Sequence, residues 1–453
     1  MPHPRPPILL VATMCAVTTI SQARAEETGV FPYMIHEAVL DNGLRVVVVP
    51  MPTPGVVAYH TWMSVGSRDE VDPGRTGFAH FFEHLMFYGS EELDREEHER
   101  IVQRMGAAEN AWTWHDDTVY HTVANKDALP EIVRIESDRF MNLHLEDDDV
   151  RREAGAVRGE FLKGRASPGN LLSEELYATA FTTHTYGHST IGYEADILAM
   201  PTSLDYARTF YDRYYRPENT TIHVSGDVDP EASLDLIRTA YGGWERAAEP
   251  PPEVPVEPLQ EAMRTAELTW PSPTAPRVAY GWRLSGESQD ESGAALQIIE
   301  ELLFAPVGPL TRRIVEEEDL AYYVHGGRDS TVDPGLFTIT VMAKDAGHFD
   351  AIDTILREEI DNLRTDGPDI DRLTATRSHS RYSLLLDLAD PARVNSTLGW
   401  QTRRGGDAGA FDRFFAKYLA VTPEDVQRVA AQTFIDDQLT RVTLTSAPQE
   451  EAP

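Results

Sequence analysis

Runs of apolar residues with strand-like character recur through the first half of the chain. Residues 40–52 (LDNGLRVVVVPMP) combine an Asn-Gly turn with four consecutive valines, and residues 55–67 alternate roughly between apolar and polar positions. Residues 109–124 are rich in the aromatic and β-branched side chains that favour strands. Residues 221–230 fit a strand that ends in a turn. These segments predict a β-sheet.

Helical spacing of apolar residues separates these strands. Residues 129–145 have this spacing and carry Pro130 near the start, where a helix tolerates proline. Residues 148–164 begin with acidic residues, which stabilise the N-terminus of a helix. A third predicted helix, containing residues 79–90, follows a loop rich in Gly, Asp and Pro.

The pattern stops at a proline-rich stretch and then begins again. Residues 249–261 hold five prolines in thirteen residues, which cannot sustain a helix or a central strand. Strand-like residues 277–284, helical residues 293–304 and strand-like residues 335–343 follow. We therefore predict an α+β fold made of two related domains, each an antiparallel or mixed sheet with helices packed on it. The predicted bounds are 26–248 for the N-terminal domain, 249–261 for the linker and 262–453 for the C-terminal domain.

Length and charge narrow the possible functions. A chain of 453 residues is too long for one ordinary core, which agrees with two domains. Its formal net charge is -34, from 74 acidic against 40 basic residues. Such a chain is not expected to bind nucleic acid or anionic lipid through bulk electrostatics. The charge can serve cationic partners, and it can equally serve solubility.

The N-terminus resembles an export signal. Residues 8–20 are apolar, and Ala23-Arg24-Ala25 fits a small-x-small cleavage site, so residues 1–25 are predicted to be a signal peptide. This predicts a secreted or periplasmic protein, with no later apolar run long enough to span a membrane. The only cysteine, Cys15, lies in the predicted leader. Any metal in the mature chain must then be held by His, Asp or Glu.

One short segment carries the candidate chemistry. Residues 79–90 read AHFFEHLMFYGS, with His80, Glu83 and His84 among apolar neighbours. Helical residues four apart share a face, so the two imidazoles can bind one ion, and neutral imidazoles suit zinc. Glu83 is placed to take a proton from a water molecule. Taken alone, the same three residues also fit ordinary bystanders on a helix.

At the level of longer motifs the sequence resembles a known family. The stretch TGFAHFFEHLMFYGS (76–90) resembles the signature of the pitrilysin/insulinase family of inverted-zinc metallopeptidases. The resemblance implies a Zn²⁺ cofactor held by His80, His84 and a third ligand, Glu160. It implies catalytic roles for Glu83, as the base, and for Glu153, as a carboxylate that orients a ligand or the water. Without this joint match, Glu160 would read as a solvated helix charge.

Residues 110–120 (NAWTWHDDTVY) resemble the family's Asn-Ala-x-Thr edge strand, to which a peptide substrate adds as a further strand. The resemblance implies that Asn110 and Ala111 bind substrate. Trp112 and Trp114 are expected in the core. Residues 183–197 (THTYGHSTIGYEADI) also resemble a family segment, and we expect His184 and His188 to lie in loops rather than to bind metal.

The second half departs from the family pattern at one position. Self-sufficient members carry an arginine and, seven residues later, a tyrosine that help bind the substrate backbone. In RRIVEEEDLAYY (312–323), Tyr322 falls at the tyrosine position, but Val315 stands where arginine is expected, and valine donates no side-chain hydrogen bond. Arg312 and Arg313 lie in a different helical register.

These features together predict a secreted zinc metalloendopeptidase that cleaves peptides or unfolded segments. By resemblance, the chain is the catalytic subunit of a heterodimer. A related partner without the His-x-x-Glu-His motif would supply the Arg/Tyr pair, and the two chains would close like a clam around a chamber. The alternative within the family is a non-catalytic structural or assembly subunit. A third reading, an acidic binding protein with incidental histidines, requires four independent coincidences.

Overall fold

The computed structural model describes residues 30–284 and 292–447. The predicted signal peptide, residues 1–25, lies outside these ranges. Within them, none of the helices combines the length and the apolar character needed to cross a bilayer.

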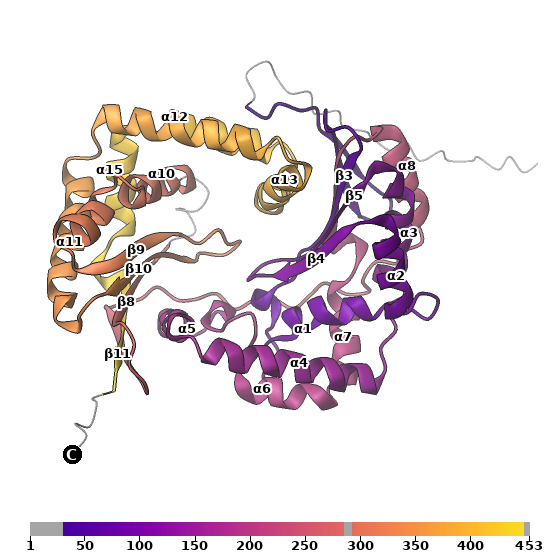
Figure 1. Cartoon of the computed structure of the whole chain (residues 1–453), viewed down its shortest axis with the longest axis horizontal. Helices are drawn as coiled ribbons and strands as arrows, with labels where there is room; N and C mark the ends of the chain where they lie inside the picture. Colours follow the sequence, from indigo (N-terminus) through magenta and orange to yellow (C-terminus); the bar gives the residue numbers. More distant parts are fainter. Residues whose placement is uncertain (1–29, 285–291, 448–453) are drawn as a thin grey trace, which may run out of the picture.

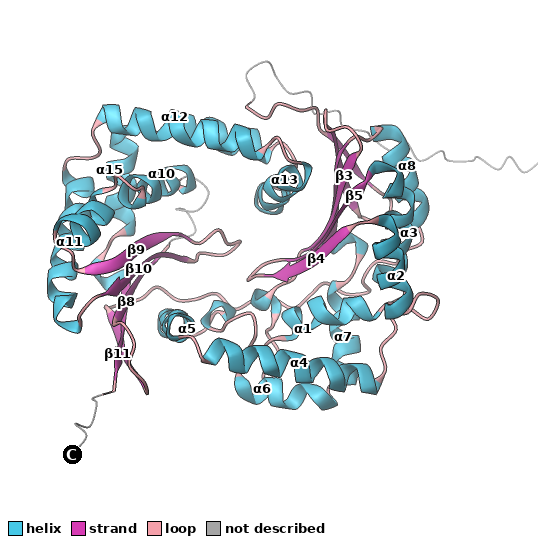
Figure 2. Ribbon diagram, viewed as in Figure 1, coloured by secondary structure: helices cyan, strands magenta, loops and turns pink. Residues whose placement is uncertain are grey.

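The first sheet has six strands in a mixed arrangement (Figures 1 and 2). In spatial order they are β1 (His36–Val39), β2 (Arg45–Pro50), β6 (Thr220–Gly226), β3 (Val56–Met63), β5 (Thr118–Asn125) and β4 (Ala108–Thr113). Strands β2 and β6 are parallel, and the other neighbours are antiparallel. Strand β4 is therefore an edge strand, as the sequence predicted for this segment.

The second sheet repeats the topology of the first. Its five strands are, in spatial order, β7 (Arg264–Trp270), β11 (Leu439–Ser446), β8 (Arg277–Arg283), β10 (Leu336–Ala343) and β9 (Ala321–Arg328). In both sheets the last strand of the half inserts between the first two and runs parallel to one of them. Among the described strands, only β1 has no counterpart in the second sheet. The predicted α+β fold with two related halves is confirmed.

Helices cover the sheets and enclose two apolar cores. The first half contains α1 (Phe78–Leu85), α2 (Arg95–Met105), α3 (Leu129–Met141), α4 (Asp147–Arg165), α5 (Pro168–Ala180), α6 (Glu194–Ala199), α7 (Leu204–Tyr214) and α8 (Pro230–Tyr241). The second contains α10 (Gly293–Phe304), α11 (Phe349–Thr365), α12 (Ile370–Asp387), α13 (Pro391–Gly405), α14 (Ala410–Ala420) and α15 (Pro423–Thr433). The larger core lies between the first sheet and α1, α3, α7 and α8, and the second between the other sheet and α10, α11 and α15.

Each half sends one helix onto the sheet of the other. Helix α5 packs on β8 and β11, with Leu172 and Leu176 buried there. Helix α13 lies on β3 and β6, and its Leu398 is buried in one cluster with Val47 and Val49 of β2. Figure 1 shows this helix of the second half against the first sheet. A Cβ at Gly399 would lie 2.1 Å from the Trp62 ring, so glycine permits this close approach. The two halves therefore share their apolar surfaces.

The proline-rich stretch has no helix or strand between residues 249 and 261. It is nevertheless fixed to the first half, because the buried carboxylate of Glu257 accepts hydrogen bonds from the backbone of Thr182, Thr183 and His184. The position of the linker and the bounds of the two domains stay a prediction.

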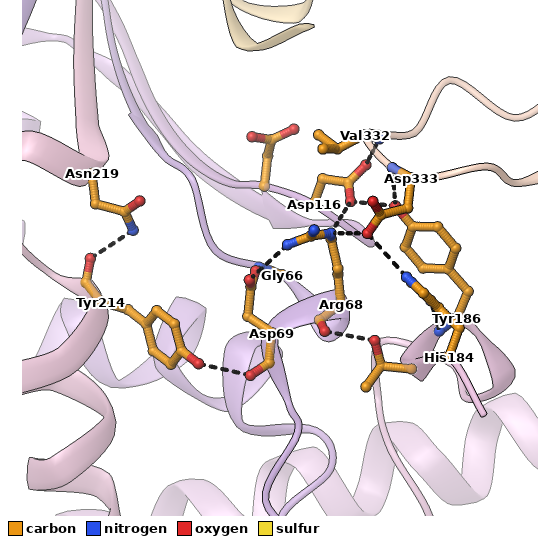
Figure 3. A network of polar contacts seen from close by, with 12 residues as sticks. Gly66, Arg68, Asp69, Asp116, His184, Tyr186, Tyr214, Asn219, Val332 and Asp333 are labelled. Atoms are coloured by element: carbon orange, nitrogen blue, oxygen red, sulfur yellow. Dashed lines mark hydrogen bonds and ion pairs between the residues drawn. The ribbon is translucent and has the colours of Figure 1, made fainter. Parts of the chain in front are cut away.

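A polar network holds the β9–β10 connection to the first half (Figure 3). The guanidinium of Arg68 donates to Asp333 at 2.6 Å, and His184 contacts the same carboxylate at 3.0 Å. The backbone N–H of Val332 donates to Asp116 at 2.8 Å. Because these groups are mostly buried, the network fixes the halves relative to each other.

The segment 109–124 differs from its strand-like prediction in one respect. It forms a hairpin, β4 and β5, in which the backbone N–H of Trp114 donates to the carbonyl of Asp117 at 2.9 Å. The prediction that Trp114 lies in the core is wrong, because its side chain is 48% exposed. Trp112 is partly buried against Trp62 and Trp400.

Candidate active site

Helix α1 is fixed at its N-terminus by a glycine and a buried carboxylate. Gly77 has φ +86, and a Cβ there would lie 2.4 Å from the carbonyl oxygen of Ile191. The carboxylate of Glu70 accepts hydrogen bonds from the N–H groups of Gly77 and Ala79, both at 2.7 Å. It thereby satisfies two donors that the start of a helix leaves without partners.

The apolar face of α1 anchors the helix and leaves a polar face for chemistry. Phe78, Phe81, Phe82 and Leu85 are fully buried in the larger core. The polar residues of the motif, His80, Glu83 and His84, are only partly buried. The amphipathic pattern of the helix thus decides which side chains face the site.

Three of the residues singled out in the sequence converge. Atom Nε2 of His80 lies 3.4 Å from Oε2 of Glu160, and Nε2 of His84 lies 3.6 Å from the same oxygen. Ligand atoms of all three residues lie within 4.8 Å of one another. Glu160 comes from α4, so the cluster joins two helices that are distant in the sequence.

This donor set fits a zinc ion. Ligand atoms at about 2.1 Å from a tetrahedral zinc ion lie roughly 3.4 Å from one another, which matches the two N–O separations. Two imidazoles and one carboxylate are also the ligand types of catalytic zinc sites, which leave one position for water. Burial, and then the neighbouring His84, lower the pKa of His80 to about 4, so its ring is neutral near pH 7.

Glu153 holds His84 in one orientation. Its Oε1 lies 2.6 Å from Nδ1 of His84, and its Oε2 accepts the hydroxyl of Tyr88 at 2.9 Å. A proton on Nδ1 leaves the lone pair of Nε2 directed at the cluster. Burial opposes ionisation of Glu153, but the hydrogen bonds from His84 and Tyr88 outweigh it and lower the pKa of this carboxyl.

Glu83 lies beside the cluster and is oriented by the edge strand. The hydroxyl of Thr113 in β4 donates to Oε2 of Glu83 at 2.7 Å. Burial raises the pKa of Glu83, and the hydrogen bond from Thr113 opposes this rise. A carboxylate with a raised pKa is a better proton acceptor than a solvated one.

A cavity of about 370 Å³ adjoins the cluster at Glu160. Its walls include the aromatic side chains of Trp114, Phe161 and Tyr177 and the buried ring of His188. The predicted loop positions of His184 and His188 are confirmed in part: the first precedes a single 3-10 turn and the second follows it, and both are buried.

The predicted substrate-binding residues fall in two places. Asn110 is exposed on β4, and Ala111 beside it is partly buried, so both lie on the edge strand next to α1. Tyr322 lies in β9 of the second half and is 57% exposed. No hydrogen bond or ion pair of the described chain connects Tyr322 to the cluster, and its role stays a prediction.

Sequence reasoning assigned no role to two residues that support the site. Thr113 belongs to the quoted Asn-Ala-x-Thr pattern, yet only the fold shows that its hydroxyl reaches Glu83. Tyr88 follows His84 by four residues, a spacing that places both on one side of a helical segment. That spacing was a usable signal for its contact with Glu153.

Comparisons with known proteins agree with the fold and the cluster. The family model described as insulinase (peptidase family M16) matches residues 45–194, and the model described as the peptidase M16 inactive domain matches residues 202–378. An uncharacterized zinc protease of Streptomyces coelicolor is 25% identical over 403 residues, which cover 87% of this chain and 86% of that protein.

Solved structures give the same result. The crystal structure of a protease from Helicobacter pylori matches with a TM-score of 0.87 and 25% identity, and the match covers 91% of this chain and 99% of that one. The periplasmic protease PqqL from Escherichia coli matches with a TM-score of 0.73 and 18% identity over 94% of this chain and 48% of PqqL, which shows the fold alone. The two matched domain models, the zinc-protease relatives and the duplicated fold show that this chain belongs to the pitrilysin/insulinase (M16) peptidase family.

Proposed function

We propose that this chain is a zinc-dependent endopeptidase that cleaves peptides or unfolded segments. His80, His84 and Glu160 would hold the ion, and the convergence of their ligand atoms is the single observation that carries the proposal. A zinc ion bound there would supply Lewis-acid activation of water and of the scissile carbonyl.

The chain's own residues perform the remaining tasks. Glu83, held by Thr113, accepts the proton of the attacking water and later delivers it to the leaving amine. Glu153 keeps His84 in the tautomer that directs Nε2 at the cluster. The free edge of β4 pairs with the extended backbone of the peptide, with Asn110 and Ala111 in contact with it. The cavity beside Glu160 takes a neighbouring side chain of the substrate.

A related partner chain completes the site in this proposal. The two arginines nearest Val315, where the family pattern has an arginine, already form ion pairs within the second half. Arg312 pairs with Glu317, and Arg313 pairs with Glu358 and Glu359. Neither arginine therefore takes the place of the arginine that is missing at position 315. The partner would carry the Arg/Tyr pair without a zinc motif, and the two chains would enclose a chamber. We also propose export, with cleavage near Ala25, to the periplasm or the medium.

The substitution Glu83→Gln tests the chemistry. The amide keeps the size of the side chain but accepts no proton, so the variant is expected to bind about one equivalent of zinc and to lose turnover. Zinc content by atomic spectroscopy and peptide cleavage are measured together. Cleavage at the parental rate would show that Glu83 is not the base.

The partner is tested separately. The purified chain is assayed alone and with a related chain that lacks the motif, and activity is expected to rise strongly on mixing. Full activity of the chain alone would contradict the heterodimer. A non-catalytic subunit, the second candidate, predicts no zinc and no cleavage under either condition.

A further inference from the structure

A strongly basic pocket lies within this acidic protein. Its volume is about 290 Å³, and it is formed by α13, α14, the start of α10 and the β9–β10 connection. Among the described residues that line it, none is acidic, and five are basic: Arg328, Arg403, Arg404, Arg413 and Lys417. A chain with 74 acidic and 40 basic residues thus gathers five cations around one cavity.

Two of these cations lie near carboxylates but make no ion pair within the described part of the chain: Asp117 is near Arg404, and Glu300 is near Arg328. Arg403 pairs with Asp117 at 3.1 Å, and Arg413 pairs with Asp407 at 2.9 Å. In the described part of the chain, the guanidiniums of Arg328 and Arg404 form no ion pair. They are the groups that a bound anion would neutralise.

The side chain of Arg404 is held in place while part of it lacks a hydrogen-bond partner. Its Nη1 donates to the carbonyl of Trp400 at 3.0 Å, and its guanidinium lies 4.8 Å from the centre of the Trp400 ring. Atoms Nε and Nη2 are buried and make no hydrogen bond. Burial, and then the nearby charge of Arg404, lower the pKa of Arg328 to about 10. Two like charges in a partly buried pocket are costly unless an anion pairs with them.

The pocket adjoins the edge strand of the candidate active site. The Trp400 ring stacks on Trp112 of β4, with centroids 5.3 Å apart, and Arg403 binds Asp117 in the β4–β5 turn. Trp114 in that same turn lines the cavity beside Glu160. A peptide paired with β4 would therefore pass close to the pocket.

We propose that this pocket binds a carboxylate of an Asp or Glu side chain of the peptide substrate through Arg404 and Arg328. The proposal rests on the proposed peptidase function and adds a substrate class to it, namely peptides with an acidic group. The planar, forked guanidinium matches a carboxylate through two parallel hydrogen bonds.

The test uses matched peptides. A neutral peptide that the parent protein cleaves receives one Glu at successive positions, and each peptide has a Gln twin. The Glu twin is expected to show about tenfold higher kcat/KM at one or two positions, as a charge-assisted hydrogen bond predicts. In Arg404→Gln and Arg328→Gln this Glu/Gln ratio falls to about one. Arg428→Gln, which removes an exposed charge paired with Asp425, is the control and keeps the ratio.

Several results would overturn the proposal. One such result is that the parent protein cleaves the Glu and Gln peptides equally well at every position. Another is that the Glu/Gln ratio stays high in both Arg404→Gln and Arg328→Gln. Calorimetric binding of inorganic phosphate that Arg404→Gln abolishes, without any Glu preference, would assign the pocket to a free anion instead. Thermal unfolding shows whether the variants are folded, and removal of a buried unpaired charge is expected to leave the midpoint unchanged or higher. If no peptide is cleaved, the proposed function fails, and binding of labelled Glu and Gln peptides then decides the pocket by itself.

Discussion

Helices α1 and α10 occupy equivalent places in the two halves but differ in chemistry. Each follows the strand that lies third from the β2 or β7 side of its sheet, and each buries an apolar face in its core. On α1 the remaining face carries His80, Glu83 and His84. On α10 the polar residues with the same spacing are Gln297, Glu300 and Glu301. Glu301 accepts hydrogen bonds from the hydroxyls of Tyr418 and Ser380.

The comparison separates scaffold from function. The apolar residues place a helix on the sheet in both halves, whereas only α1 carries two histidines, His80 and His84, that can act as metal ligands. The family model that matches residues 202–378, which include α10, is described as an inactive domain, and α10 contains no histidine. The following predictions test this contrast, from the largest expected effect to the smallest.

Substitution of a candidate ligand should remove the metal and the activity. His84→Ala deletes one of three donors, so zinc content is expected to fall from about one equivalent to near zero and turnover by at least about a thousandfold. Glu301→Gln in α10 is the matched control and should keep both. Metal analysis and peptide assays are the measurements. Equal loss in the two variants would remove the functional distinction between the helices.

Helices α5 and α13, each of which packs on the sheet of the other half, should contribute similarly to the free energy of unfolding. Leu172→Ala in α5 and Leu398→Ala in α13 each leave a cavity in a buried apolar contact and should lower the free energy of unfolding by about 2–5 kcal/mol. Urea denaturation measures the change, with Leu162→Ala, at an exposed position, as the control. A loss confined to one of the two variants would show that only one exchange holds the halves together.

The carboxylate of Glu153, which contacts Nδ1 of His84, should increase the affinity for metal without being essential for it. Glu153→Gln weakens the orientation of the imidazole, and zinc affinity is expected to fall by about 10–100-fold. Competition with a chelator gives the dissociation constant. Asp148→Asn, at an exposed position on the same helix, controls for the change of charge. Unchanged affinity in Glu153→Gln would mean that its contact with His84 is only structural.

Buried histidines beneath α13 should make the fold sensitive to acid. Burial lowers the pKa of His223 to about 3, below the ordinary value of 6.5. Between about pH 6.5 and 3, His223 therefore binds a proton in the unfolded chain but not in the folded chain. The free energy of unfolding consequently falls as the pH drops through this range. The expected loss is roughly 1.4 kcal/mol per pH unit for each such histidine.

The substitution His223→Leu should reduce the pH dependence of the free energy of unfolding by the contribution of one proton. Urea unfolding of parent and variant between pH 7 and 5 measures the difference, and His379→Gln, an exposed imidazole, controls for loss of a histidine. Identical slopes in the parent and His223→Leu would contradict the burial argument.

The sequence predicts much of this molecule because its strongest signals are local. Two local patterns predict buried elements: the four valines Val46–Val49 and the helical spacing of apolar residues in 293–304. The structure has strand β2 and helix α10 at these positions. The topological match of the two sheets could not be derived from local pattern, because it depends on which strands pair. The family resemblance, rather than periodicity, supplied Glu160 and Glu153.

The errors have physical causes as well. Trp114 looked like a core residue by composition, but the hairpin places it after the last residue of β4, where an aromatic side chain lines a cavity. The basic pocket gave no sequence signal, because its arginines come from β9, α13 and α14. Residues gathered from three elements become visible only once the chain is folded.

The exchange of α5 and α13 has a consequence for any attempt to divide the protein. A cut within residues 249–261 would separate the two sheets in sequence but leave each fragment with a helix whose apolar stripe fits only the other fragment. Neither piece would be soluble by itself, whereas the two produced together would find each other and rebuild the whole. The duplicated halves therefore behave as one folding unit, in which α1 and α4, the helices of the candidate ligands, depend for their stability on the sheet of the other half.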